Sequence, residues 1–303
     1  MRDRQVRDRL LRDGFVVLAI VFVLLRLFAI QPWDQSVDAY AYWSTRDGVF
    51  YGGPIGVGPV GIDAAGHIGA YLYSPAFAQL LAPFVQLPWP VFAAGWTALN
   101  LAVLWWLVGR AALPIVLLPP VGFEIVSGNV HLLYAAAIVA GFRFGGTWAL
   151  MLLTKITPAI GLLWFAVRRE WRPLAVALGF TAAIAAASYV LDPGAWRSWI
   201  DLVVHDAGAP LVTTGWYLPV PLVARLVAAA LVVTWGAWTD RAWTIPIAVT
   251  LALPILWLNG LSILVACVPL ARERVRGSRW GRQGDVGLVR FAPRSSAPGP
   301  IDG

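Results

Sequence analysis

The chain consists of apolar runs separated by short polar segments. One run extends from Phe15 to Ile30, and further runs follow between Tyr71 and Leu270, several of them near the roughly 20 residues that cross a bilayer as a helix. The alternation of polar and apolar residues that is typical of membrane strands is absent from the sequence. The pattern therefore predicts an all-α fold, a multi-pass transmembrane helical bundle of about nine or ten membrane segments, including short re-entrant or broken helices.

A polar stretch, residues 31–70, interrupts this pattern after the first apolar run. It holds four Asp, one His and a cluster of Tyr and Trp, and such groups gain no stability from contact with lipid. We therefore expect residues 31–70 to form an outer loop that carries the active site. We make the same prediction of an outer loop for residues 192–218.

Arginine placement predicts how the chain threads through the membrane, because positive residues favour the cytoplasmic side. Residues 1–14 are basic and should be cytoplasmic, and residues 15–271 form the transmembrane domain. This threading requires residues 71–87 to be re-entrant or interfacial and residues 144–167 to form a broken hairpin. Residues 272–303, rich in Arg, Gly, Ser and Pro, are expected to be a disordered cytoplasmic tail.

Composition excludes most other classes of protein. With 59% hydrophobic and 13% charged residues and a mean hydropathy of +0.71, the chain could not fold as a soluble globule without exposing large apolar patches. The net charge of +7 arises mainly from the tails and turns, so we predict membrane lipids and no nucleic acid as partners. Neither the single Cys267 nor the three histidines show a metal-ligand spacing, and we predict no metal and no cofactor.

Asp38 is the first candidate for chemistry. It lies in SVDAYAYW, where Tyr40 and Tyr42 supply the flat faces and hydrogen-bonding edges that sugar recognition uses. A carboxylate shortly after a membrane helix is well placed to take a proton from an acceptor hydroxyl. The alternative is that Asp38 is only solvated or forms a turn.

Lys155, the only lysine of the chain, is the second candidate. A cation among apolar neighbours costs several kcal/mol unless it meets an anion or reaches water, so we interpret it as a phosphate ligand. The alternatives are that it snorkels to the interface or pairs with Glu124. Three weaker substrate-binding candidates, each with an alternative as a turn, helix cap or solvated loop residue, are Asn129, His205 and Arg225.

Four motifs follow one another along the chain: Asp38 with Tyr42, the segment YLYSP at 71–75, Gly128 with Asn129, and Lys155 with Pro158. Their order resembles glycosyltransferase family 87, whose members include polyprenyl-phosphate-mannose-dependent mannosyltransferases and related arabinofuranosyltransferases. Ser74 departs from the family pattern, because it stands where the family has proline, and the chain is shorter than the family leads us to expect.

The resemblance implies a GT-C architecture with its active site at the outer face of a bacterial plasma membrane and both chain termini in the cytoplasm. It implies transfer of mannose or arabinofuranose from a polyprenyl-phosphate sugar donor to a glycolipid or cell-envelope glycan acceptor. Asp38 would be the general base and Lys155 would stabilise the phosphate leaving group, while Tyr40, Tyr42 and Tyr73 would shape the sugar site. The alternatives are a lipid-linked sugar transporter or flippase and a non-catalytic membrane scaffold.

Overall fold

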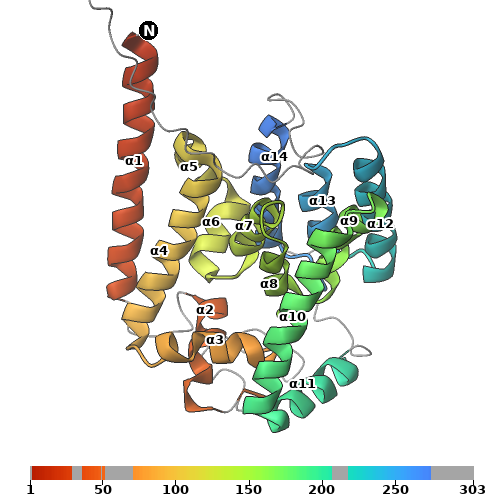
Figure 1. The fold of residues 1–303 in the computed structure, drawn as a ribbon. Coiled ribbons are helices and arrows are strands. Elements are labelled where there is room, and N and C mark those ends of the chain that lie inside the picture. Colours follow the sequence, from red (N-terminus) through yellow and green to blue (C-terminus); the bar gives the residue numbers. More distant parts are fainter. Residues whose placement is uncertain (1, 29–35, 49, 52–70, 207–217, 274–303) are drawn as a thin grey trace, which may run out of the picture.

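The computed structural model describes residues 2–28, 36–48, 50–51, 71–206 and 218–273. All regular structure in these ranges is helical. Helices α1 (Arg2–Leu27) and α4 (Trp89–Val108) pack side by side on one flank, and α10 (Trp171–Leu191) and α12 (Leu222–Trp238) lie on the other side of the molecule (Figure 1). The expected all-α fold is confirmed.

Helix length and apolar character identify candidate membrane spans. Trp89–Val116, which contains α4, and α10 are long and apolar enough to cross a membrane. Helices α6 (Pro119–Ser127) and α7 (His131–Gly141) pass the same test as a pair bent by 106° and would make a third span. The protein is therefore an all-α membrane protein, while the number of nine or ten membrane segments stays a prediction.

Short and broken helices fill the space between the long ones, as the sequence predicts. Trp148, Tyr134, Ile138, Ile245 and Ile263 are completely buried among them and form the centre of the largest core cluster. The elements that supply this interior and its margins are η3 (Gly109–Ala111), α5 (Ala112–Val116), η4 (Gly145–Trp148), α8 (Ala149–Leu152), η5 (Thr157–Leu162), α9 (Leu163–Val167), α13 (Thr244–Leu251), η6 (Leu258–Ala266) and α14 (Cys267–Glu273).

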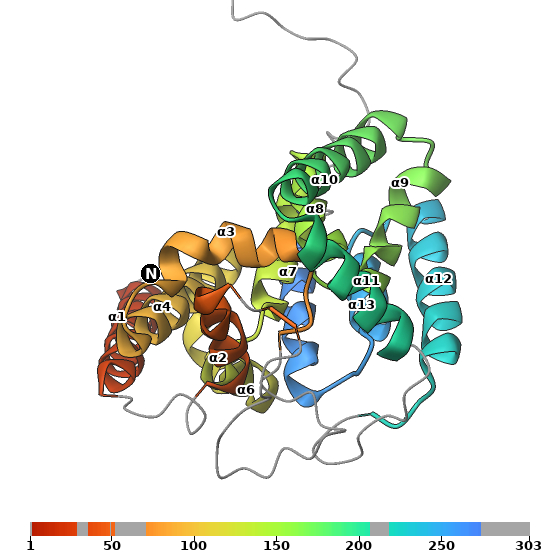
Figure 2. The same cartoon turned by 90° about the horizontal axis from the view of Figure 1, so that it is seen from below.

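Four helical segments cover the end of the bundle that lies opposite the start of α1 (Figures 1 and 2). They are α2 (Val37–Trp43), η2 (Ser44–Asp47), α3 (Pro75–Val85) and α11 (Pro193–Asp206).

The two regions expected to be outer loops therefore each contain a helix where the structure describes them, and their place outside the membrane stays a prediction. Helix α2 forms because its Ala39, Ala41 and Tyr42 are buried against the bundle, and α11 begins at a proline after Asp192, whose Oδ1 accepts the Ala195 N–H at 2.9 Å.

Two other parts of the expected division of the chain stay predictions. The basic residues from Arg2 onward belong to the same helix, α1, as the apolar run after Phe15, so the structure shows no break at residue 14. Most of the predicted disordered tail, residues 274–303, lies outside the described residues.

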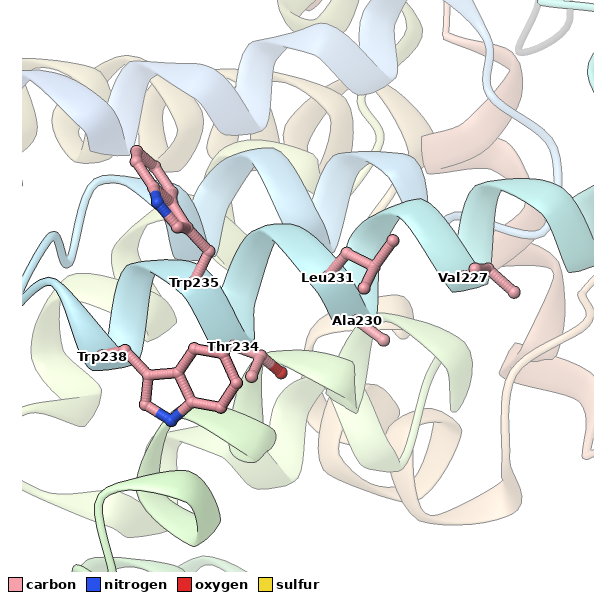
Figure 3. Close-up of a pocket in the computed structure, with 6 residues that line it drawn as sticks. All are labelled: Val227, Ala230, Leu231, Thr234, Trp235 and Trp238. Atoms are coloured by element: carbon pink, nitrogen blue, oxygen red, sulfur yellow. The ribbon is translucent and has the colours of Figure 1, made fainter.

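The outer face of α12 carries a shallow apolar hollow of about 460 Å³ (Figure 3). Four of its six lining side chains, Val227, Leu231, Trp235 and Trp238, are exposed large hydrophobic residues. The only side-chain oxygen among the lining residues belongs to Thr234. This hollow is the kind of surface that lipid covers, and it offers no group for proton or phosphate chemistry.

Candidate active site

Helix α2 presents Asp38 and Tyr42 on one face, because residues four apart are neighbours on a helix. The Tyr42 hydroxyl lies 3.3 Å from the hydroxyl of Tyr73, which comes from the segment that leads into α3. The Asp38 carboxylate interacts with the side chain of Asn129. Asp38 and Asn129, which are separated by more than 90 positions in the sequence, thus meet at the covered end of the bundle.

Gly128 makes the close approach of α2 possible. It ends α6 with a φ of +71°, in the left-handed region that glycine adopts most readily. A Cβ atom at this position would lie 2.7 Å from the Cβ of Ala39, which is closer than two carbon atoms can pack. A side chain at residue 128 would therefore push α2, and Asp38 with it, away from the turn that carries Asn129.

Asn129 links the polar groups of the site. Its Oδ1 accepts the backbone N–H of Val130 at 2.8 Å and faces the Tyr73 hydroxyl and the Lys155 Nζ, each at 3.5 Å. Because the oxygen faces these three donors, the amide NH₂ group is left for the acceptor that lies on the other side, the Asp38 carboxylate.

Lys155 lies in the break between α8 and η5, as the predicted broken hairpin requires. Its Nζ is 3.1 Å from Nε2 of His131 and 5.6 Å from the centre of the Tyr73 ring. The ammonium therefore sits among a neutral amide oxygen, an imidazole and an aromatic face. The structure brings Lys155 into the same cluster as Asp38, Asn129, Tyr42 and Tyr73.

Two further residues of the cluster were not predicted as site residues, although the sequence suggested Glu124 as an alternative partner of Lys155. Glu124 and His131 are completely or almost completely buried, with exposed fractions of 0% and 1%. The Nδ1 atom of His131 lies 2.9 Å from Oε2 of Glu124, so His131 stands between Glu124 and Lys155. The sequence feature that could have indicated them is a Glu and a His on either side of a Ser-Gly-Asn turn, in a chain with only one lysine.

The surroundings of Asp38 raise the pKa of its carboxyl group above the ordinary value. Burial is the main cause, because it disfavours the charged form, and the negative charge of Glu124 acts in the same direction. Lys155, the Asn129 side chain and His131 act in the opposite direction but do not cancel the shift. A carboxylate of raised pKa is a stronger base than an exposed one, as proton removal from a hydroxyl requires.

The remaining sequence-predicted residues lie elsewhere or have other partners. Tyr40 faces away from Asp38 and packs edge-on against Trp89 with ring centres 5.9 Å apart. Arg225 is buried, and its guanidinium donates four hydrogen bonds to backbone carbonyls. His205 lies in α11, and its side chain is outside the described part of the structure.

No group of three or more His, Cys, Asp or Glu side chains that could hold a metal occurs among the residues that the structure describes. The absence of a required metal or cofactor stays a prediction.

Comparison with known proteins places the chain in a family. The model of glycosyltransferase family 87 matches residues 71–281, which is more than half of the sequence. The chain belongs to glycosyltransferase family 87. Tyr73, Asn129 and Lys155 of this family 87 protein lie inside the matched range, and Asp38 precedes it.

One curated relative of the family 87 chain is a polyprenol-phosphate-mannose-dependent alpha-(1-2)-phosphatidylinositol mannoside mannosyltransferase from Mycobacterium tuberculosis. It is 26% identical over 229 residues, covering 62% of this chain and 52% of the relative. The chain thus spans about half the length of that protein. No solved structure matches the chain.

Proposed function

We propose that this family 87 protein transfers a sugar, mannose or arabinofuranose, from a polyprenyl-phosphate donor to a glycolipid or cell-envelope glycan acceptor. The observation that carries the proposal is the meeting of a carboxylate, a cation and two tyrosines around Asn129. The family supports glycosyl transfer, and the name of the curated relative supports a polyprenol-phosphate sugar as the donor.

In the proposed reaction, Asp38 removes the proton from an acceptor hydroxyl, and the hydroxyl oxygen forms a bond to the anomeric carbon of the donor sugar. The bond between that carbon and the phosphate oxygen breaks, and the polyprenyl phosphate leaves with the bonding electrons. The phosphate gains negative charge in this step, and the nearby Lys155 ammonium stabilises it. Attack from the side opposite the phosphate inverts the configuration of the sugar.

The tyrosines provide the proposed sugar surface. Tyr42 and Tyr73 are both buried, with ring centres 5.5 Å apart, and their hydroxyl groups face each other beside Asn129. Flat rings with a polar edge suit the apolar faces and hydroxyl groups of a sugar. Contacts of substrate with Tyr40, His205 and Arg225 stay predictions.

The distribution of charge supports a site at the outer face of a bacterial plasma membrane. Arg110, which follows α4, pairs with Asp8 in the basic first part of α1. Arg168 donates to the carbonyl of Ala237 at 3.1 Å, near the end of α12. These arginines lie at ends of helices away from α2, and positive residues favour the cytoplasmic side. With this orientation both termini are cytoplasmic.

The experiment is a transfer assay in membranes that contain or lack the expressed protein. Polyprenyl-phosphate-mannose and polyprenyl-phosphate-arabinose, each with a labelled sugar, are supplied separately, and label in extracted glycolipid and glycan is measured. We expect one donor to give product with the native protein and with Asp47→Asn, a matched change of an exposed carboxylate in the neighbouring η2, but not with Asp38→Asn. Equal product from Asp38→Asn would contradict the base role.

The same assay separates the alternatives of transport and scaffolding. A transporter or flippase would move the labelled donor across the membrane without forming a new glycosidic bond. A scaffold would give product only when other envelope enzymes are present, so reconstitution of the purified protein in vesicles decides this point. Product formation by the purified protein is the outcome that our proposal requires.

A further inference from the structure

The buried pair of Glu124 and His131 has no part in the reaction as described above. Glu124 belongs to the last turn of α6, but its carboxylate forms hydrogen bonds with the next helix, α7. Its Oε1 accepts the backbone N–H groups of His131 at 2.6 Å and Leu132 at 3.4 Å, at the start of α7. A carboxylate at this place caps the unpaired N–H groups of a helix and is favoured by the helix dipole. Glu124 is thereby fixed.

The fixed carboxylate determines the tautomer of His131. When Glu124 is ionised, its carboxylate only accepts hydrogen bonds, and the Nδ1 atom, 2.9 Å from Glu124 Oε2, then carries the proton; the two backbone N–H groups at Oε1 favour this ionised form. In the neutral ring the other nitrogen, Nε2, then has a free lone pair. Lys155 Nζ lies 3.1 Å from Nε2 and, as an ammonium, can only donate. The hydrogen bonds therefore run in one direction, from Lys155 through His131 to Glu124.

This arrangement solves a problem that a lone buried lysine poses. A lysine side chain has four rotatable bonds, and two carboxylates, Asp38 and Glu124, lie near enough to act on the charge of Lys155. A direct ion pair with Asp38 would weaken the base and neutralise the cation at once. A neutral imidazole holds the ammonium in place without cancelling its charge.

We propose that Glu124 and His131 are positioning residues that hold the Lys155 ammonium toward Asn129, where the leaving phosphate of the donor develops its charge. The role of the phosphate rests on the proposed function, whereas the hydrogen-bonded chain itself does not. A lysine that is held in place stabilises charge in the transition state without further reorganisation.

Two amide variants of His131 separate its two contacts. Asparagine is short and places its amide near the position of Nδ1, where it can still donate to Glu124 but does not reach Lys155. Glutamine is longer by one methylene group and places an amide oxygen near the position of Nε2, where it can accept from Lys155. Comparison of His131→Asn with His131→Gln therefore separates the contact with Lys155 from the contact with Glu124, which caps α7.

The kinetic expectation concerns kcat rather than KM for the donor. We expect His131→Asn to lower kcat about 100-fold, as loss of a supporting contact does at other sites, and His131→Gln to recover most of this loss. Addition of His131→Asn to Lys155→Met should cause little further loss, because the two residues act as one unit. A fully active His131→Asn variant, or losses that multiply in the double variant, would overturn the positioning role.

A second measurement does not depend on sugar transfer. Histidine labelled with nitrogen-15 reports the tautomer by NMR in the lipid-embedded protein, and His131→Asn identifies the resonances among the three histidines of the chain. We expect a neutral His131 ring with its proton on Nδ1, and a shift of the Nε2 resonance in Lys155→Met. A proton on Nε2, or an Nε2 resonance that ignores Lys155→Met, would contradict the inference.

The two measurements distinguish failure of the inference from failure of the proposed function. If the native protein transfers no sugar but the Nε2 resonance responds to Lys155→Met, the hydrogen-bonded chain stands and the proposed reaction is wrong. If the native protein transfers sugar but the resonance does not respond, the reaction stands and His131 does not hold Lys155.

Discussion

Lys155 and Arg225 are both basic residues in apolar surroundings, and the structure treats them differently. The Arg225 guanidinium donates to the carbonyls of Val220, Leu251, Leu253 and Pro254 at 2.5 to 2.9 Å. The Lys155 ammonium instead meets an imidazole nitrogen and an amide oxygen. The donors of Arg225 are used by the protein itself, whereas Lys155 keeps a charge that is directed toward a cluster with Asp38. Burial of a cation alone therefore does not identify a ligand site.

The largest expected effect comes from removal of the Lys155 charge. Lys155→Met keeps the apolar stem of the side chain and loses the ammonium, so the leaving phosphate is no longer stabilised. We expect sugar transfer to fall about 1000-fold, measured as initial rate with saturating donor in vesicles. Lys155→Arg keeps the charge and should retain more activity than Lys155→Met. Equal rates of native protein and Lys155→Met would show that Lys155 does not act on the phosphate.

Arg225→Met should act on folding rather than on the reaction. The change leaves four carbonyls without their donor, among them the buried carbonyl of Leu253, and an unsatisfied buried group costs about 1 to 3 kcal/mol. We expect a clear fall in the melting temperature of the detergent-purified protein, whereas Arg197→Met, a control on the exposed side of α11, should melt like the native protein. A normal melting temperature together with a raised KM for the donor would instead support the substrate-binding role that the sequence suggests.

The sequence alone supports some of these assignments and not others. Apolar runs predict helices, and a lone lysine or an Asp after the first run is conspicuous against them, so Asp38 and Lys155 could be proposed as site residues without the structure. Arg225 is conspicuous in the same way, as a basic residue in an apolar run. The sequence does not show whether the partner of such a cation is a substrate or a backbone carbonyl. Its partners come from the irregular end of α13, whose course the sequence does not specify.

The role of Glu124 and His131 depends on tertiary structure. The two residues meet because α6 and α7 are bent by 106° around Gly128 and Asn129. A Ser-Gly-Asn turn predicts a change of direction but not its angle. Helix α2 could not be predicted from the sequence for a related reason. Its seven residues gain their stability from packing against the bundle rather than from a strong helical pattern.

The pH dependence of transfer tests the environment of Asp38. A general base must be ionised, so the rate should fall as the pH falls through the pKa of Asp38. Because that pKa is raised, chiefly by burial, the loss should begin at a higher pH than it would for an exposed aspartate. The Asn129 side chain favours the ionised form, so Asn129→Ala should move this acid limb further upward. A limb that stays at the same pH would show that Asn129 does not act on Asp38.

The raised pKa of Asp38 also predicts how this residue affects the stability of the fold. A carboxyl group with a raised pKa binds its proton more readily in the folded than in the unfolded chain, so its contribution favours folding at low pH and is lost as the pH rises through the raised value. Asp38→Asn should therefore melt at least as high as the native protein at neutral pH. A marked fall in its melting temperature would show that the Asp38 carboxylate stabilises the fold.

Ser74 gives the smallest expected effect and tests how Lys155 is connected to the tyrosine segment. Its backbone N–H and its hydroxyl both donate to the carbonyl of Leu153, at 3.2 and 2.5 Å, and Leu153 lies two residues before Lys155. Proline, which the resemblance to the family leads us to expect at this position, could make neither bond. Ser74→Ala removes one bond and should lower stability by about 1 kcal/mol and the transfer rate a few-fold.

Ser74→Pro removes both bonds and should lower stability and rate further, although it brings the sequence closer to the family pattern. The control is Ser44→Ala, because the Ser44 hydroxyl bonds only to the carbonyl of Ala41 in its own helical turn. Melting temperature and transfer rate are measured together for the three variants. If Ser74→Pro were more active than the native protein, the two bonds from Ser74 to Leu153 would hinder Lys155 from reaching its active position. That outcome would contradict the supporting role expected of Ser74.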